Sequence, residues 1–439
     1  IFTQSVIARA GDRARLIAWT GNVLVRALAD NRSFDVLAAG SAGTGTAMLS
    51  GSTITVVSQT EATAELGNAV TVRADDSVGV VADAQGIIGS TGTAVSATSG
   101  AASAGATVHT IVVENAITAK VGDMADLIGY AATSMPSIAG VSQAGIEIPN
   151  REQRRRGVAV SATGDARVYM GSVSGPLALG TASVTGVVNT AVVNNRIHAH
   201  VGDGVKINAA ASQDASAAEG SYTHDGDSGA EQEVSVESEG ETHLYNFAGS
   251  LSIGNAAGVG ATVVVQVIGN SVEAKIGDGG AAFATRAMRV RADSNDQVAL
   301  AGLGFGIAGT AAVAPDVSAL VFNASVVAEA GGSMTAGTGI EVDAKSNTDI
   351  YNIGAALAGS GSAAVSPVAI VTYFNGTTDA SVLDSASLNA GSGSVSVTAD
   401  STENIVTAAN GVSVSGAAAV SGSVSVTVSK AATRAQARR

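Results

Sequence analysis

The chain repeats itself, and this repetition restricts its fold more than any other feature of the sequence. A nine-residue motif, Asn-x-φ-x-Ala-x-φ-Gly-Asp with φ an apolar residue, occurs at Asn115–Asp123, Asn195–Asp203 and Asn270–Asp278. Related copies lie at Gln4–Asp12, Thr60–Asn68, Asn323–Gly332 and Asn375–Asp384, the last two with one extra residue. Internal repetition at a fixed period is typical of solenoids, propellers and other repeat architectures.

A second motif, φ-x-φ-x-Ala, follows each copy of the first. It occurs at Val23–Ala27, Val70–Ala74, Val158–Ala162, Val205–Ala209, Met288–Ala292, Ile340–Ala344 and Val395–Ala399. Successive ends of the first motif are separated by 56, 55, 80, 75, 54 and 52 residues. The sequence therefore predicts about seven units of about 54 residues, two of which carry insertions.

Both motifs alternate apolar residues with other residues, which is the two-residue period of β-strands. We expect a turn at each Gly-Asp step, because Gly accepts positive φ and Asp bonds its own backbone. Stretches of small residues between the motifs, such as 89–106 and 249–261, allow backbones to approach closely.

Repeated strands build propellers, sandwich arrays or solenoids. The single Trp argues against a propeller with an aromatic signature, and no linkers mark separate sandwich domains. We therefore predict an all-β fold, a parallel β-helix that forms one continuous array over residues 1–439. Two or three coils per unit, stacked ~4.8 Å apart, would give a rod of roughly 70–100 Å. In that arrangement the motif Asn residues would not lie in adjacent coils.

Composition narrows the function classes. Hydrophobic residues make up 46% of the chain but aromatic residues only 3%, which predicts a narrow interior of small side chains. A net charge of −14 excludes nucleic acid as a main partner, since phosphate binding needs a basic surface. The longest apolar stretch, Val298–Pro315, is short and interrupted by glycines, so we expect no membrane insertion. Few charges and many Ser, Thr, Asn and Gly residues suit the surface of an extracellular fibre.

The two motifs, with the Gly/Ala-rich strands between them, resemble the repeats of large bacterial exoproteins. These are the filamentous-haemagglutinin-like and leukotoxin-like surface proteins of Gram-negative bacteria, often exported by two-partner secretion. The resemblance implies a secreted or surface-exposed β-helical adhesin used in adhesion, biofilm or spacing. It names no ligand.

Two charged insertions are candidate interaction loops. The first, about residues 124–157, is basic and contains Arg151, Arg154, Arg155 and Arg156. The second, about residues 210–245, is acidic and contains Glu237, Glu239 and Glu241. Each is otherwise a solvated surface loop, and the two could pair with each other. Asp225, Asp227 and Glu231 in the acidic insertion are candidate calcium ligands, because Ca²⁺ prefers several carboxylate oxygens.

No other cluster predicts a cofactor or a catalytic site. His198 and His200 share one strand face, but matching positions in other units hold Thr118, Lys120 and Glu273, so we expect them to be variable surface positions. We therefore expect a non-catalytic structural or adhesive protein at the cell surface or outside the cell. Two alternatives stay open. One is a carbohydrate-active β-helix such as a polysaccharide lyase or a tailspike-like depolymerase, and the other is a calcium-stabilised matrix protein.

The two ends of the chain fall at the same phase of the repeat, in the first motif. Exposed strand edges in such a solenoid pair with further strands. We expect self-association, head to tail or lateral, and binding to glycans or proteins of host or bacterial surfaces.

Overall fold

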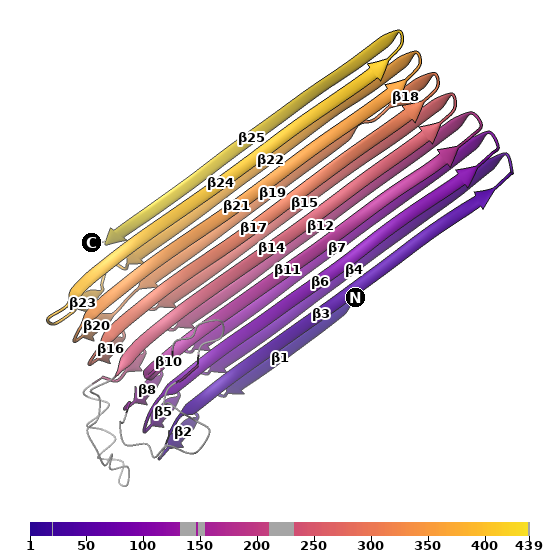
Figure 1. Ribbon diagram of the computed structural model, residues 1–439. Helices are drawn as coiled ribbons and strands as arrows, with labels where there is room; N and C mark the ends of the chain where they lie inside the picture. Colours follow the sequence, from indigo (N-terminus) through magenta and orange to yellow (C-terminus); the bar gives the residue numbers. More distant parts are fainter. Residues whose placement is uncertain (20, 132–145, 148–153, 210–231, 438–439) are drawn as a thin grey trace.

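A computed structural model describes residues 1–439 except residues 20, 132–145, 148–153, 210–231 and 438–439. The described chain is a succession of strands without a helix. Figure 1 shows the strands stacked side by side, each turn of the chain lying against the one before it. The pairing between successive turns is parallel, which confirms the prediction of a parallel β-helix.

Three parallel sheets make up the solenoid. The outgoing sheet contains β3 (Val23–Gly43), β6 (Val78–Thr98), β11 (Gly157–Ala178), β14 (Glu233–Gly254), β17 (Ala287–Ala308), β21 (Gly339–Ser360) and β24 (Ser394–Ser415). The return sheet contains β1 (Phe2–Ala10), β4 (Ala47–Leu66), β7 (Ala102–Val121), β12 (Ala182–Val201), β15 (Ala257–Ile276), β18 (Ala311–Val313), β19 (Asp316–Ala330), β22 (Ala363–Val382) and β25 (Ala418–Ala437). The short sheet contains β2 (Arg15–Ala18), β5 (Thr71–Ala74), β8 (Asp126–Gly129), β13 (Lys206–Ile207), β16 (Ala281–Ala284), β20 (Ser333–Ala336) and β23 (Ser387–Asn389). A separate antiparallel pair joins β9 (Ile146–Glu147) to β10 (Arg154–Arg155).

Each repeat unit forms one coil, so the expectation of two or three coils per unit was wrong. Ala47 of β4 pairs with Ala102 of β7, one unit later, and Ala102 pairs with Ala182 of β12. The unit is long because its two main strands have 20 to 22 residues each instead of the usual five or six. At ~3.3 Å per residue and ~4.8 Å per coil, the strands run ~66 Å while seven coils stack only ~34 Å. The molecule is therefore a plate rather than a rod.

The plate has two halves with different interiors. We call the half next to the short sheet the proximal half, and the half next to the tight turns between outgoing and return strands the distal half. Proximal interior positions hold apolar residues such as Val72, Ala119 and Val160. In the distal half the two long sheets approach so closely that a Cβ on Gly260 of β15 would lie 2.1 Å from the Phe305 carbonyl oxygen of β17. At such close approaches the interior has room only for small side chains, whereas farther from the turns it holds the stacked rings of Phe322 and Phe374.

The Gly-Asp turns form a ladder between coils. The Asp123 carboxylate accepts a hydrogen bond from the backbone N–H of Asp203 at 3.0 Å, and Asp203 accepts from that of Asp278 at 2.9 Å. The Asp thus bonds the next coil and not its own backbone, and positive φ falls on the following residue, such as Met124. Gly202 is small because its Cβ would meet the Asp123 Oδ1 at 2.3 Å. Contacts between successive coils, rather than the expected turn chemistry, therefore explain why Gly and Asp recur in the motif.

One coil per unit also stacks the motif Asn residues, contrary to expectation. The Asn115 side chain donates to Asn195 at 2.8 Å inside the solenoid, and Asn195 and Asn270 both donate to Thr242 of the outgoing sheet. The pairing places Ala324, not Asn323, beside Asn270. The extra residue of the last two copies therefore lies at their start.

The copies of the second motif fall on two different structural elements. Val158–Ala162 begins β11, and its partner in the preceding coil is Val78–Ala82 of β6. Val70–Ala74 and Val205–Ala209 instead fall on the short sheet, at β5 and β13. Both elements match the motif because each presents the same alternation of apolar residues to the proximal core.

Candidate functional site

The outer faces of the distal half are apolar, while several inward positions of the same strands hold polar side chains. In β25, Val424 and Val426 point outward and are 60% and 44% exposed. Ser425 between them reaches across the interior to Thr407 of β24 at 3.0 Å. Ser96 of β6 and Ser103 of β7 likewise bond across the layers at 2.7 Å. The expected polar surface is therefore wrong for this half, because its outward rows carry apolar side chains.

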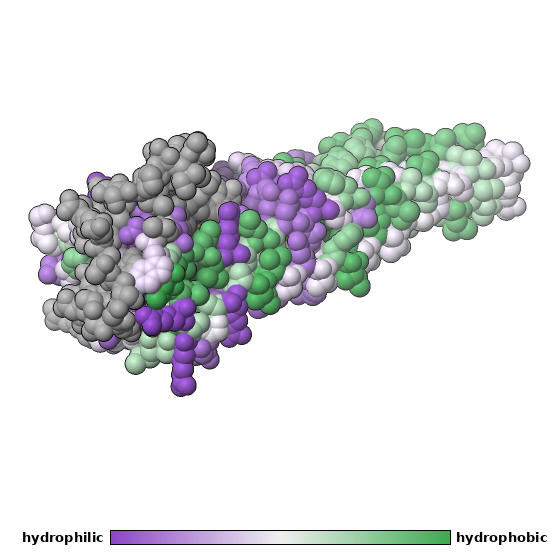
Figure 2. All heavy atoms as spheres, turned by 90° about the horizontal axis from the view of Figure 1, so that it is seen from below, coloured by the Kyte–Doolittle hydropathy of each residue, from purple (hydrophilic) through white to green (hydrophobic). Residues whose placement is uncertain are grey.

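Charged residues are nearly absent from the distal half. Its seven coils contain no Lys, Arg or Glu, and their only Asp and His are Asp316 and His109, both buried in the interior. The segments concerned are 36–57, 86–113, 168–195, 244–272, 298–328, 350–378 and 404–429. Figure 2 shows the result on one face, where hydrophobic residues gather toward the distal end and hydrophilic ones lie nearer the proximal end.

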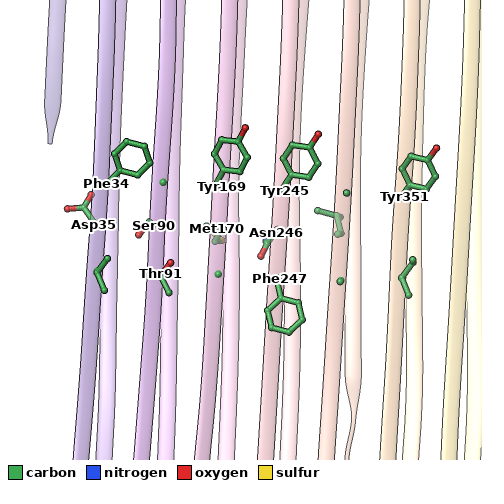
Figure 3. A pocket seen from close by; sticks show the side chains of 17 residues that line it. Phe34, Asp35, Ser90, Thr91, Tyr169, Met170, Tyr245, Asn246, Phe247 and Tyr351 are labelled. Carbon is green, nitrogen blue, oxygen red and sulfur yellow. The ribbon is translucent and has the colours of Figure 1, made fainter.

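A row of aromatic side chains crosses the outgoing sheet where the two halves meet. Phe34, Tyr169, Tyr245 and Tyr351 occupy one outward row, with Gly89 and Ala299 at the intervening coils. The rings of Tyr169 and Tyr245 lie parallel, 5.5 Å apart between centroids. The Tyr245 hydroxyl donates to Gln297 at 2.6 Å, on the proximal side. Figure 3 shows the three tyrosine hydroxyls pointing in one direction along the strands.

The aromatic row borders a shallow groove of about 560 Å³ on the outgoing face. Its walls are mainly apolar and come from β3, β6, β11, β14, β17 and β21. The Phe34 ring leans over Gly89, where a Cβ would meet it at 2.5 Å. Ala299 lies between Tyr245 and Tyr351 in this row, and Figure 3 shows no ring between the two tyrosines. The groove is thus a flat apolar surface with one distinct notch.

The return sheet carries a polar row at the corresponding boundary. Gln59 donates to Glu114 at 3.0 Å, and Asn194, Asn323 and Asn375 continue the same outward row. Two shallow depressions of about 280 and 350 Å³ follow this row. Neutral amides at one-coil spacing can bind hydroxyl-rich surfaces through hydrogen bonds.

The sequence did not single out the aromatic row, although a signal for it was present. Phe34, Tyr169 and Tyr351 each lie eleven residues after the first residue of a second-motif copy, at Val23, Val158 and Ile340. Equal offsets within a repeat place residues in one row of a solenoid. The position of Tyr245 could not be predicted in this way, because the matching segment, which starts at Val234, ends in Ser238 rather than Ala and so does not fit the motif.

The acidic candidates do not form a loop. Glu237, Glu239 and Glu241 lie within β14, and Glu237 is buried. Their charge predicts a loop, yet they alternate with Val234, Val236 and Ser238 as a strand requires. Asp225, Asp227 and Glu231 lie outside the described residues, in 210–231.

One group of potential metal ligands is present in the described part of the chain, formed by Asp165, Glu241 and His243. Arg167 already forms an ion pair with Asp165 at 2.8 Å, and His243 lies 3.7 Å from Glu241. His198 and His200 are outside this group and half-buried on the return face, where His198 contacts Ser271 at 3.2 Å. The three residues of the group therefore contact neighbouring side chains of β11 and β14, with Asp165 buried.

The basic candidates are only partly described. Arg151 lies outside the described residues, and Arg154 and Arg155 form β10. Arg156 forms an ion pair with Asp76 of the preceding coil at 3.3 Å. Burial raises the pKa of the Asp76 carboxyl, against the opposing influence of the nearby Arg156 charge. Arg156 therefore helps to neutralise a buried acid within the chain.

His109, Asp296 and Asp316 are ionisable groups buried inside the solenoid. Burial lowers the pKa of His109 to about 4, and its ring nitrogens bond Ser90 and Ser172 at 2.6 and 3.0 Å. Burial raises the pKa of Asp296 to about 7, although Ser294 and Asn270 bond it. Burial also raises the pKa of Asp316 to about 7, and its two oxygens have no hydrogen-bond partner among the described residues. All three are uncharged over much of the acidic pH range.

No protein-family model matches the chain, and no curated protein or solved structure was found to be similar to it. The resemblance to bacterial exoprotein repeats therefore stays an expectation. Among the described residues, no helix is long and apolar enough to cross a membrane. The features that bear on function are thus the two repetitive outer faces.

Proposed function

We propose that the chain is a non-catalytic structural and adhesive β-solenoid that works outside the cell through its broad repetitive faces. The main support is the unbroken register of its rows. Each outward position recurs once per coil over seven coils, from Phe34 to Val406 on the outgoing face and from Gln59 to Lys430 on the return face. Such rows favour many weak, equivalent contacts over one deep site.

The open edges of the sheets support self-association as part of this role. The outer edges of β3 and β24 pair with no other strand of the described chain. Unpaired edges of long strands are templates for further strands, whether these come from a longer chain or from a second copy. An adhesive surface made of rows gains contacts with every coil that is added.

A binding assay and a turnover assay together test this proposal. The purified chain is applied to arrays of glycans and surface proteins, and the same polysaccharides are incubated with it while new reducing ends are counted. We expect adhesion without release of reducing ends. Turnover of any polysaccharide would replace the structural role with the carbohydrate-active alternative. For the calcium-stabilised alternative, EDTA should lower the melting temperature, whereas we expect no shift.

A further inference from the structure

The outgoing face of the distal half is large enough to be an interface. Seven strands ~4.8 Å apart and about ten residues of ~3.3 Å each cover ~1,100 Å². A standard stable interface buries about 800 Å² per partner, and the largest apolar patch on an ordinary monomer is about 300–600 Å². Exposed members include Tyr169, Phe247, Leu251 and Ile307, at 43%, 41%, 39% and 44%.

The shape of this sheet favours a flat protein partner. Figure 1 shows the long strands running nearly parallel from the first coil to the last. Flat sheets of many strands are unusual and are typically stabilised by stacking on another sheet or by side-chain ladders. A second β-sheet packs on such a face at ~10 Å, with side chains of the two faces interdigitating.

The relief of the face is in part complementary to itself. At two levels, a large side chain on one of the strands β11 and β17 is matched by a small one on the other. Tyr169 is level with Ala299, and Gly175 is level with Phe305. Between them, Gly171 is level with Ala301 and Val173 with Leu303. These two strands lie one coil to either side of β14.

We propose that this face is the interface of a two-fold symmetric dimer of the chain, with the symmetry axis running along β14. The rotation keeps the strand direction and reverses the order of the coils. It therefore places β11 of one copy over β17 of the other, at matching levels. Tyr169 of each copy then enters the open notch at the other copy's Ala299, and each Phe305 lies over a Gly175.

The central strand meets its own copy on the axis. Tyr245, Phe247 and Leu251 of β14 form an aromatic and aliphatic centre at which the two sheets contact each other. Two-fold interfaces are isologous, so one surface supplies both halves of each contact. Large aromatic residues near the middle of an interface usually contribute most of its affinity.

The return face offers no comparable selection of register. Its outward row nearest the turns is Ala in every coil, at Ala47, Ala102, Ala182, Ala257, Ala311, Ala363 and Ala418. A uniform row fits a partner equally well after a shift of one coil. On the outgoing face, large and small residues vary from coil to coil, so a shift of one coil changes which side chains meet.

Complementary charges test the arrangement. Ala299→Lys and Tyr169→Glu should each raise the dimer dissociation constant at least about tenfold, because each places unpaired charges in a dry interface. An equimolar mixture of the two variants should restore the dimer, since the introduced ammonium group of one copy then faces the introduced carboxylate of the other. Val265→Lys, on the return face, is the matched control and should not change the dissociation constant. Analytical ultracentrifugation measures all four samples.

A crosslinking measurement covers the case in which a charged variant does not fold. The chain has no cysteine, so Tyr245→Cys introduces a single thiol on the symmetry axis. A short bis-maleimide should join two copies through this thiol, whereas Val265→Cys should stay uncrosslinked. Circular dichroism melts identify which variants are folded.

Four results would overturn the dimer. These are a chain that sediments as a monomer at high concentration, a dimer insensitive to both charged variants, a mixture that fails to restore it, and a monomer that binds phosphatidylcholine vesicles through this face instead. The inference deepens the proposed structural role but fails separately from it. The sedimentation experiment measures assembly, and the reducing-end assay measures catalysis.

Discussion

At the scale of single residues, burial inside the distal half decides which groups can carry charge. Asp316 follows Pro315 at the start of β19 and points into the space beneath Gly302 and Gly354, where added Cβ atoms would lie 2.3 Å from its oxygens. A buried carboxyl without partners is most stable with its proton on. The raised pKa of Asp316, about 7, follows from this position.

Replacing Asp316 should change how stability depends on pH. Its pKa in the folded chain is about 7, above the ordinary value of 3.8, so the folded state keeps a proton that the unfolded state loses. The contribution of the Asp316 carboxyl to the free energy of unfolding is therefore complete below about pH 4 and is lost as the pH rises to about 7. Asp316→Asn should remove this fall, raising the melting temperature at pH 8 while leaving it unchanged at pH 4. Thermal melts between pH 4 and 8 measure it, with exposed Asp400→Asn as the control. Equal pH profiles for wild type and Asp316→Asn would contradict the assignment.

At the scale of the turns and strands, the contacts between coils are as important as those within a coil. Each Gly-Asp turn rests against the turn before it, and the Asp side chain connects the two. Such a ladder needs a residue without a Cβ at the Gly position.

Adding one methyl group at a turn should therefore be costly. Gly202→Ala places a Cβ 2.3 Å from Asp123 Oδ1 and 2.9 Å from its backbone nitrogen, so one turn must move. We expect a loss of roughly 1–3 kcal/mol in the free energy of unfolding, measured by denaturant titration. Gly186→Ala, in the strand β12 that leads into this turn, is the matched control, since no atom lies within 4 Å of its added Cβ. Equal losses for the two variants would show that the turn contact is unimportant.

The repeat, the strands and the solenoid could be predicted from the sequence, because alternation and periodicity are local signals. The face on which each residue lies could also have been predicted, but only by following the two-residue alternation along a whole strand without interruption. In β12, Ile197 and Ala199 point inward, and the same alternation places Val192 and Val188 outside. Val187, Ala191 and Val193 also lie inside, so apolar residues occupy both faces in this part of the strand, which short motifs cannot reveal. The hydrogen bond from Gln85 to Asp165 and the contact of His109 with Ser172 join different coils, and no sequence spacing gives them.

At the scale of the whole molecule, the coil is the unit of construction. Neighbouring coils pair residue by residue, so the solenoid should tolerate the loss of a complete coil more readily than the loss of part of one. The register shows where such a cut has to be made. Ala281 of β16 pairs with Ser333 of β20, the first residues of two successive short strands.

Deleting residues 281–332 should therefore leave a folded plate. Gly280 then joins Ser333 in register, and the stack shortens by ~4.8 Å while the strand dimension is unchanged. Circular dichroism measures the fold, and small-angle scattering measures the two dimensions. Deleting residues 281–308 is the control, because it removes an outgoing strand but keeps its return strand, and should unfold the neighbouring coils. A folded control, or an unfolded full-coil deletion, would contradict the one-coil unit.

The one-coil unit also determines how the chain responds to a pulling force. Tension along the stack reaches the backbone hydrogen bonds of an end strand one after another, so the outermost coil peels away while the others stay paired. A released coil of about 54 residues extends to ~180 Å at ~3.4 Å per residue, against the ~4.8 Å it occupied in the stack. Anchored at both ends, the molecule acts as a tether that lengthens in discrete steps and dissipates mechanical work before it breaks.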